Sequence, residues 1–372
     1  MGELGATNRT LPSTDPPGRP PGPVGPTGSP VTLDAVARTA GVSPATASRA
    51  LNGTTRVRED LRTRVLAAAD ELGYIPNAHA QALASSSNNT VGVICHDVSD
   101  PYFAAISSGV MRAAAEHELL VMLASTFREP DREIAYVSML RAQRARAILL
   151  IASGIEDRAW ERSLDTELAA YQNGGGRVAV VSRHRSLRVD TVLPENRAGA
   201  TALARALLGL GHREFAILTG PARLTTVSDR LAGFRDGLAE AGVRLPRERV
   251  ITGAFTRDGG HDAAVELLRR GDRPSCVFAV TDVMAVGALA AFREHGLRVP
   301  EDISLAGFDD IPLVRELTPP LTTVALPLTA MGHSAIALAL REQRGQRSRV
   351  ERVAGEVVLR ASTAAPPAHG GR

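Results

Sequence analysis

The stretch from residue 31 to residue 53, VTLDAVARTAGVSPATASRALNG, constrains the fold more than any other part of the chain. Its pattern predicts two short helices joined by a tight turn. Thr32 can cap the first helix through its hydroxyl, and Gly41 follows the last apolar position, where a left-handed residue ends a helix at little steric cost. Ser43 can cap the second helix, and Pro44 suits the first helical position, where no N–H is needed. The stretch therefore predicts a helix-turn-helix.

The second of these helices is expected to bury one face and to expose another. Ala47, with Ala50 or Leu51, falls on the inner side. The outer side is short and polar and carries a single arginine; it contains Ala45, Thr46, Ser48, Arg49 and Asn52. Such a face suits a DNA groove, although a helical hairpin that only packs on a neighbour has the same spacing.

A third helix is expected from about Arg58 to Leu72, because apolar residues recur there at helical spacing and Gly73 follows. The residues expected to close the small core are Leu61, Val65, Leu66, Ala69 and Leu72. After an extended joint at residues 74–76, Asn77 can cap a last short helix, residues 78–84. Seven residues are too few for a stable helix in water, where about 12 to 15 are needed, so this hinge should fold only when something packs on it.

Residues 31–84 resemble, without a gap, the DNA-binding head of the LacI/GalR family of bacterial transcription regulators. The resemblance implies that hinge helices pair between two subunits while Leu83 is wedged into the minor groove, which kinks the duplex. Leu83 could instead be a core residue of the following domain. The residues expected at the DNA are Thr32, Ser43, Pro44, Ala45, Thr46, Ser48, Arg49, Asn52, Asn77 and Leu83. Arg49 is the candidate for a guanine edge.

Charge and composition constrain the function less than this motif does. The 372-residue chain has a net charge of +3 and 44% hydrophobic residues, and its basic residues are all arginine. Residues 31–84 contain six arginines and five acids, so charge alone does not identify a DNA-binding protein. We expect a cytoplasmic protein without a membrane segment, because no apolar run approaches the roughly 20 residues that span a bilayer. Cys95 and Cys276 lie in apolar runs and are expected to be buried thiols.

The chain is predicted to contain five parts. Residues 1–30 are rich in Pro, Gly, Ser and Thr and should form a disordered arm. Residues 31–76 form the DNA-binding domain, and residues 77–89 the hinge helix and linker. Residues 90–361 form an effector-binding and dimerisation domain, and residues 362–372 a disordered tail.

From Thr90 onward, β-branched runs alternate with helical patterns, which is typical of parallel sheets flanked by helices. This pattern is similar to that of periplasmic sugar-binding proteins. The expected fold is thus an all-α helix-turn-helix head followed by an α/β domain of two lobes, each with a parallel sheet. The resemblance implies crossover strands, which we place near Leu193, Val324 and Val353.

Ligands of open α/β sheets bind beyond the carboxyl ends of the strands, where this chain carries polar and aromatic residues. The expected effector-binding residues are Asp97, Tyr102, Phe103, Ser182, Thr226, Arg230, Phe255, Asp282 and Asp309. Arg230 and Asp309 also match family ligand contacts, in SDRLAGF and AGFDD. Phe103 and Phe255 should stack on a ring, whereas Asp97 and Asp282 either bind ligand or cap a helix.

Two residues depart from the patterns of family members. Purine-binding members carry Arg where Leu224 stands, and many sugar-binding members carry Asp where Ser182 stands. These departures weigh against a purine and against a simple hexose.

No catalytic constellation, metal site or cofactor motif is recognised, so an enzyme is not expected. The resemblance implies a ligand-responsive regulator that binds double-stranded palindromic operator DNA as a homodimer, most simply a repressor of carbohydrate-utilisation genes whose effector is a sugar or sugar derivative. The C-terminal segment lacks a leucine heptad, which favours a dimer over a tetramer. The alternatives are a regulator that answers to a nucleoside, another metabolite or a protein co-regulator, and a solute-binding protein.

Overall fold

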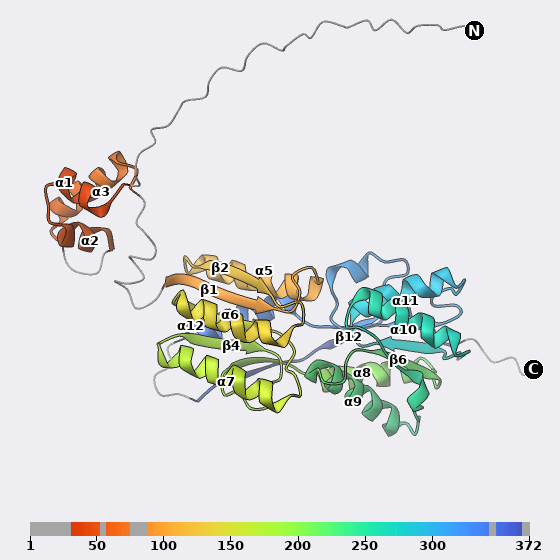
Figure 1. Cartoon of the computed structure of the whole chain (residues 1–372). Helices are drawn as coiled ribbons and strands as arrows, with labels where there is room; N and C mark the ends of the chain where they lie inside the picture. Colours follow the sequence, from red (N-terminus) through yellow and green to blue (C-terminus); the bar gives the residue numbers. More distant parts are fainter. Residues whose placement is uncertain (1–30, 53–56, 75–87, 272, 342–346, 367–372) are drawn as a thin grey trace, which may run out of the picture. The chain divides into compact units, whose positions relative to one another are not determined.

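The computed structural model describes residues 31–52, 57–74, 88–271, 273–341 and 347–366. The chain divides into two compact units, Met1–Gln81 and Ala82–Arg372, which we call the head and the two-lobed unit (Figure 1). The predicted arm, the hinge at residues 77–84, the linker to residue 87 and residues 367–372 lie outside the described residues. Within the described ranges, none of the helices has the length and apolar character required to cross a membrane.

The head contains the three predicted helices: α1 (Leu33–Ala40), α2 (Pro44–Asn52) and α3 (Glu59–Glu71). Thr32 caps α1, as predicted, and Gly41 ends it with a φ of 64°. At that position a side chain would also collide with the Arg64 guanidinium, which donates a hydrogen bond to the carbonyl of Ala40. These contacts fix α3 against the end of α1.

One prediction for the head is wrong. Leu66 was expected in the core, but its residue is 46% exposed, and Ala68 is buried instead. The apolar positions that α3 turns inward are thus Val65, Ala68 and Ala69, with Leu72 packed against them. Leu66 lies one position outside this stripe, where the helical period turns it to solvent.

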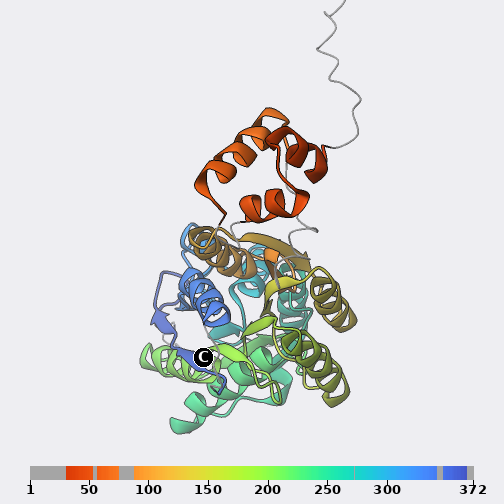
Figure 2. The ribbon, with the colours of Figure 1, turned by 90° about the vertical axis from the view of Figure 1, so that its left-hand side faces the viewer.

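The N-terminal lobe of the two-lobed unit is a parallel six-stranded sheet in the order β11-β5-β4-β3-β1-β2. Its strands are β1 (Asn88–Cys95), β2 (Leu120–Ser125), β3 (Ala145–Ile151), β4 (Arg177–Val181), β5 (Asp190–Pro194) and β11 (Val350–Val353). Its helices are α5 (Pro101–Glu116), α6 (Pro130–Ala142), α7 (Arg158–Asn173) and α12 (Leu328–Leu340). Alternate side chains of β3 enter two separate cores, one beneath α5 and α12 and the other beneath α6 and α7. Figure 2 shows α12 on one side of this sheet and α6 and α7 on the other.

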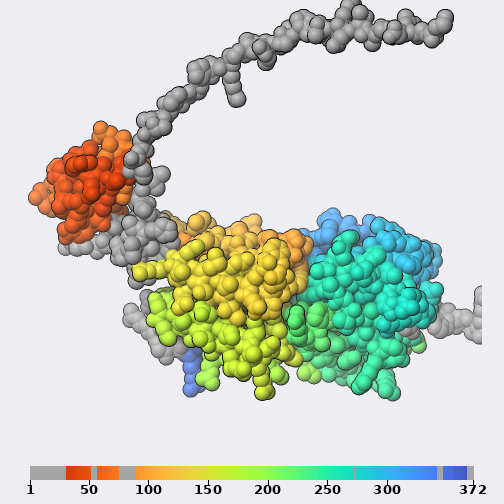
Figure 3. All heavy atoms as spheres, viewed as in Figure 1, coloured from red at the N-terminus to blue at the C-terminus, as the bar shows by residue number. Residues whose placement is uncertain are grey.

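The C-terminal lobe has a parallel four-stranded sheet in the order β7-β6-β8-β9. Its strands are β6 (Phe215–Thr219), β7 (Val250–Thr252), β8 (Cys276–Ala279) and β9 (Ser304–Ala306). Its helices are α8 (Asn196–Gly209), α9 (Thr225–Glu240), α10 (Arg257–Arg269) and α11 (Asp282–Glu294), with short 3-10 helices at Arg247–Arg249 and Pro312–Arg315. An antiparallel pair, β10 (Thr323–Ala325) and β12 (Glu356–Val358), completes the lobe. The two lobes adjoin each other in Figure 3.

The chain passes between the lobes at residues 194–196, 325–328 and 353–356, close to the predicted positions. The fold class is confirmed, and Cys95 and Cys276 are buried, as predicted. Helices α7 and α12 were not predicted.

The predicted tail begins too early. Ser362 is 1% exposed, and its hydroxyl donates to the carbonyl of Leu305 (2.6 Å) and accepts from Thr322 N (2.8 Å). The segment from residue 362 was expected to be a tail because its small polar residues show no apolar periodicity. The C-terminal lobe therefore extends beyond residue 361.

Candidate functional site

Helix α2 is anchored at its start and along its inner face. Ser43 accepts a hydrogen bond from Thr46 N (3.2 Å), and the two hydroxyls lie 2.9 Å apart. Pro44 occupies the first helical position. Ala47 and Ala50 are buried in the core of the head, as predicted. The local sequence thus holds one face of α2 against α1 and α3.

The opposite face of α2 is open to solvent. Pro44, Ala45 and Arg49 are exposed, and Thr46 and Ser48 are half-buried. Nε of Arg49 donates to the carbonyl of Ala45 (3.1 Å), so this side chain runs back along the exposed face. The structure therefore brings five of the predicted DNA-facing residues onto one surface.

The other predicted DNA-facing residues are placed only in part. The hydroxyl of Thr32 accepts from Ala35 N (3.3 Å) as the cap of α1. The side chain of Asn52, and all of Asn77 and Leu83, lie outside the described part of the chain. Their roles remain those that the sequence predicts.

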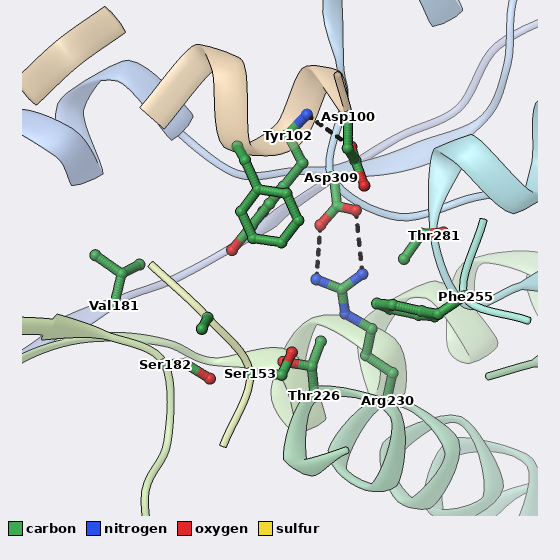
Figure 4. A pocket seen from close by; sticks show the side chains of 12 residues that line it. Asp100, Tyr102, Ser153, Val181, Ser182, Thr226, Arg230, Phe255, Thr281 and Asp309 are labelled. Atoms are coloured by element: carbon green, nitrogen blue, oxygen red, sulfur yellow. Dashed lines mark hydrogen bonds and ion pairs between the residues drawn. The ribbon is translucent and has the colours of Figure 1, made fainter. Parts of the chain in front are cut away.

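A pocket lies between the two lobes, at the carboxyl ends of their strands (Figure 4). Elements of the N-terminal lobe supply the start of α5 and the residues after β3 and β4, and the C-terminal lobe supplies α9 and the residues after β7, β8 and β9. The lining residues are Asp100, Tyr102, Phe103, Ala152, Ser153, Val181, Ser182, Thr226, Arg230, Phe255, Thr281 and Asp309. Seven of the nine predicted effector-binding residues are among them.

The floor of this pocket is an ion pair between Arg230 and Asp309. Nη2 and Nη1 of Arg230 donate to Oδ1 (2.6 Å) and Oδ2 (3.2 Å) of Asp309, as Figure 4 shows. Nη1 also donates to the carbonyl of Val280 (2.7 Å), and Nε to Oδ1 of Asn196 (2.9 Å). Burial raises the pKa of Asp309 to about 6, although the Arg230 charge and hydrogen bonds lower it. At neutral pH the pair is therefore ionised and its charges cancel.

Sequence reasoning missed Asn196, because the first residue of a helix carries no distinctive pattern. It also missed Ser153, although Ser153 follows β3 as Ser182 follows β4. The hydroxyl of Ser153 donates to the Thr226 hydroxyl (2.9 Å), and Ser153 N donates to Nε2 of His96 (3.1 Å). These contacts make Ser153 the link between the lobes in the polar part of the wall.

His96 is a buried, neutral part of this network. Its Nδ1 lies 3.3 Å from the hydroxyl of Thr126, and because Nε2 accepts from a backbone N–H, Nδ1 carries the proton. Burial and the nearby Arg128 charge lower the pKa of His96 to about 3. His96 therefore positions Ser153 and does not contribute charge.

Two further predicted residues shape the wall in ways that the sequence did not indicate. Ser182 has a φ of 144°, and its buried Oγ has no hydrogen-bond partner among the described residues. Phe255 packs so closely on Gly220 that a Cβ there would lie 2.5 Å from the ring. A polar atom and an aromatic face are thus presented to the pocket.

Asp282 does not take the cap role predicted as one of its alternatives, and it lies outside the pocket lining. Asp282 is fully buried and accepts from Ile311 N (2.9 Å) and from the hydroxyl of Thr323 (2.6 Å). The cap of α11 is Thr281, whose hydroxyl accepts from Met284 N (3.3 Å). Burial, together with the nearby Asp309 charge, raises the pKa of Asp282 to about 7. Asp282 joins the loop after β9 to strand β10 and does not line the pocket.

Asp97 also lies outside the pocket lining. Its Oδ1 accepts from the backbone N–H (2.9 Å) and the hydroxyl (2.7 Å) of Ser99 in a local turn. The cap of α5 is Asp100, which accepts from Tyr102 N (3.0 Å). Neither the ligand role nor the cap role predicted for Asp97 is seen.

Asp97 instead lines a second cavity of about 310 Å³, which shares Asp100 with the pocket. The pocket itself has a volume of only about 20 Å³, room for one or two water molecules. Arg128 lies at the junction, with Nη2 3.5 Å from Oδ2 of Asp100. Its guanidinium carbon is 5.9 Å from the Phe103 ring centre and 5.3 Å from that of Phe255. Arg128 was not predicted, because the positive φ values at Phe127 and Arg128 direct it inward, and the sequence pattern does not indicate them.

Family comparisons agree with this architecture. Residues 32–77 match the family model for bacterial regulatory proteins of the lacI family, and residues 204–363 match that for a periplasmic binding protein-like domain. The HTH-type transcriptional regulator DegA of Bacillus subtilis is 34% identical over 335 residues, which span 89% of this chain and 98% of DegA. The HTH-type transcriptional regulator GalS of Salmonella typhimurium is 36% identical over 85% of this chain and 91% of GalS.

Solved structures show the same arrangement. The Lac repressor dimer bound to operator and the anti-inducer ONPF is 27% identical, with a TM-score of 0.76, over 91% of this chain and 100% of that chain. A complex of the transcriptional regulator CelR with cellobiose is 29% identical, with a TM-score of 0.66, over 89% of this chain and 99% of that chain. The likeness thus covers both the head and the two lobes.

Proposed function

Because this chain belongs to the lacI family of bacterial regulatory proteins, we propose that it is a repressor that binds a near-palindromic operator as a homodimer under the control of a neutral effector. The observation that carries this proposal is the pocket lined by residues of both lobes, on a chain that also has a helix-turn-helix. A ligand held by both lobes favours one arrangement of them over another. That differential affinity is what ligand control of DNA binding requires.

The DNA contacts proposed for the head follow from the exposed face of α2. In helix-turn-helix proteins the second helix enters the major groove, and a dimer reads two half-sites related by its own symmetry. Arg49 is the side chain on this face suited to a bidentate guanine contact. Pro44 and Ala45 have no side-chain donor or acceptor, so they act through shape and apolar contact. Leu83 is proposed, from the sequence, to be wedged into the minor groove between the half-sites and to kink the duplex there.

The charges of the pocket favour a neutral sugar or sugar derivative. Arg230 is paired with Asp309, and Arg128 lies against Asp100, so each guanidinium already faces a carboxylate. The other polar side chains of the lining carry hydroxyls; they are Tyr102, Ser153, Ser182, Thr226 and Thr281. The rings of Phe103 and Phe255 can pack on the apolar face of a sugar. A phosphate or carboxylate would have to compete with Asp309 and Asp100 for these two guanidinium groups. The similar structure of CelR is a complex with cellobiose, which is consistent with a sugar.

A nucleoside is the second candidate, because aromatic rings stack on a base as readily as on a sugar. Leu224 is 7% exposed and belongs to the core that includes Ile155, so it offers no hydrogen bond to a base edge. This feature ranks the nucleoside below the sugar. Both candidates are neutral ring compounds.

The surface proposed for the homodimer is formed by α5 and β2. Strand β2 lies at the end of the strand order, and its Leu120 is 68% exposed and its Met122 38%. Met111 of α5 is 43% exposed. Large exposed apolar residues grouped on neighbouring elements mark an interaction surface, and the Lac repressor complex of similar fold is a dimer. We also propose that the protein works in the cytoplasm, at DNA, and that it catalyses no reaction.

The test is a thermal-shift screen of the full-length protein with neutral sugars, sugar phosphates, sugar acids and nucleosides. A ligand at 100 times its Kd should stabilise the protein by about 2.7 kcal/mol. Hits are then added to complexes with an operator selected from random DNA, and the change in operator affinity is measured. A hit among neutral sugars that weakens or strengthens operator binding supports the proposal. Stabilisation by charged sugars alone, or failure to select any DNA, would contradict it.

A further inference from the structure

At the edge of the pocket, a side chain of the protein itself lies against the two rings that are expected to stack on an effector. Phe103 comes from α5 in the N-terminal lobe, and Phe255 from the loop after β7 in the C-terminal lobe. The Arg128 guanidinium contacts both rings, at 5.9 Å and 5.3 Å from their centres. An effector ring that packs on either phenylalanine therefore meets Arg128.

Arg128 is held there by weak contacts. Its Nη2 is 3.5 Å from Asp100, whose carboxylate already caps α5. Its Nη1 is buried and has no hydrogen-bond partner in the part of the chain that the structure describes. Burial lowers the pKa of Arg128, although Asp100 and Asp97 oppose that effect. One nitrogen of this charged group thus lacks an acceptor, so displacement of the side chain would give up only the 3.5 Å ion pair and the contacts with the two rings.

The backbone directs Arg128 inward. Phe127 and Arg128 have φ values of 51° and 63°, in a region that residues other than glycine seldom adopt. The turn is fixed by hydrogen bonds from Phe127 N to the carbonyl of His96 (2.7 Å) and from Glu129 N to that of Thr126 (3.0 Å). Phe127 is 60% exposed, whereas the Arg128 side chain is 22% exposed. A specific corner of the chain thus places this arginine beside Phe103 and Phe255, at the edge of the pocket.

The volumes of the pocket and of the adjoining cavity indicate how a movement of the Arg128 side chain would change the space for a ligand. The inner pocket has about 20 Å³, far below the roughly 300 to 1,000 Å³ of most ligand sites. The outer cavity has about 310 Å³, and Arg128 and Asp100 both line it. Rotation of one flexible side chain into the outer cavity would open the space between the two rings.

We propose that Arg128 is a specificity-determining residue of the pocket, a displaceable plug that competes with the effector for the position between Phe103 and Phe255. Only a ring that both stacks there and bonds to the polar floor displaces it. Weakly stacking compounds are excluded. The identity of the competing ligand rests on the proposed function, whereas the plug itself does not.

The first test does not require the effector. Arg128→Ala in the full-length protein leaves a gap of guanidinium size between two aromatic rings and beside a carboxylate. Ethylguanidinium, followed by calorimetry at millimolar concentration, should bind this variant saturably and should not bind the unmodified protein. Arg132→Ala is the matched control, because Arg132 also lies over a phenylalanine ring, that of Phe127 at 5.7 Å, but on the exposed surface. The proposal that Arg128 is a plug is overturned if Arg128→Ala shows no ethylguanidinium site, or if Arg132→Ala shows an equal one. Arg128→Gln replaces Arg128→Ala if the latter does not fold.

The second test uses the panel of neutral sugars and nucleosides. Arg128→Ala should bind at least one of them with a Kd about tenfold or more below that of the unmodified protein, equivalent to about 1.4 kcal/mol. It should also accept more members of the panel than Arg132→Ala does. Equal affinities for the variant and the unmodified protein overturn the plug and leave the effector proposal standing. A saturable ethylguanidinium site without binding of any panel member supports the plug and counts against the proposed effector class.

Discussion

Arg230 and Asp309 face each other through two hydrogen bonds of 2.6 Å and 3.2 Å, with 1% and 3% of their side chains exposed. Helix α9 supplies the arginine, and the residues after β9 supply the aspartate. Asp309 N also donates to the carbonyl of Val324 (2.9 Å) in the neighbouring strand β10. The pair therefore forms the floor of the pocket and also joins α9 to the residues after β9 within the C-terminal lobe. Substitutions at this pair change ligand binding and stability together.

Asp309→Asn should uncouple the effector from DNA binding. The substitution keeps the shape of the side chain but leaves the buried Arg230 charge uncompensated, and breaking a buried pair costs about 3 to 5 kcal/mol. We expect urea denaturation to show a loss at or below this range, because the amide oxygen still accepts a hydrogen bond. Operator affinity at low temperature should be unchanged, while the response to the effector is lost.

The control for this variant is Asp229→Asn, which breaks the Arg183–Asp229 pair. That pair has similar geometry, at 2.9 and 2.8 Å, but its side chains are 33% and 23% exposed. Its loss should cost about 1 kcal/mol or less. Equal losses in the two variants would show that burial of the Arg230 pair does not matter, and a retained effector response would remove Asp309 from the site.

Arg49→Ala should reduce sequence discrimination more than it reduces general affinity for DNA. A bidentate arginine–guanine contact contributes about 1 to 3 kcal/mol of discrimination at one base pair. Fluorescence anisotropy on the selected operator and on its single-base variants should therefore show one position at which preference disappears. Arg62→Ala, which removes an exposed arginine from α3, is the control of equal charge. If Arg62→Ala abolishes the same preference, Arg49 does not read that base pair.

Most of the architecture could be predicted from the sequence because local patterns determine it. The caps at Thr32 and Ser43, the turn at Gly41 and the alternation of apolar runs follow from spacing alone. Pocket residues were found where a polar residue lies within three residues of the end of a strand, as with Ser182 and Asp309. The carboxyl ends of parallel strands meet at one edge, so position along the chain is sufficient there.

The rest depends on three-dimensional contacts that spacing does not contain. Asp282 follows a strand as Asp309 does, but its hydrogen bonds to Ile311 and Thr323 turn it away from the pocket. Arg128 reaches the edge of the pocket because two successive residues adopt positive φ values, which no sequence pattern of non-glycine residues indicates. The direction of Asp282 thus depends on partners that lie 29 and 41 positions away in the chain. The direction of Arg128 depends on an unusual backbone conformation.

Leu120→Asp combined with Met111→Asp should convert the dimer to a monomer. Both side chains are exposed in the single chain, so the substitutions should leave the melting temperature of a monomer almost unchanged. A two-fold axis repeats each new charge in the partner, which buries four unpaired carboxylates. Sedimentation should show at least a 100-fold increase in the dimer Kd, and operator binding should be lost.

The control is Leu359→Asp, at another exposed apolar residue with 47% exposure, which should remain dimeric. If this variant dissociates equally, the surface formed by α5 and β2 is not the interface.

Glu133→Gln should stabilise the protein by an amount that grows as the pH rises from about 5 to about 8. Glu133 is 1% exposed in α6, its Oε1 has no hydrogen-bond partner among the described residues, and burial raises its pKa from 4.5 to about 8. Between these values the folded state binds more protons at this site than the unfolded state does. Stability from Glu133 is thus fully present below pH 4.5 and lost as the pH rises through 8, by at most about 1.4 kcal/mol per unit. Other buried carboxyls, such as Asp282, titrate alike in both proteins, so the difference between variant and unmodified protein isolates Glu133. Urea denaturation should show this difference in stability growing from pH 5 to pH 8. The control Glu116→Gln, at an exposed position, should show no such difference. A constant difference for Glu133→Gln would mean that Glu133 ionises in the folded protein as it does in the unfolded chain.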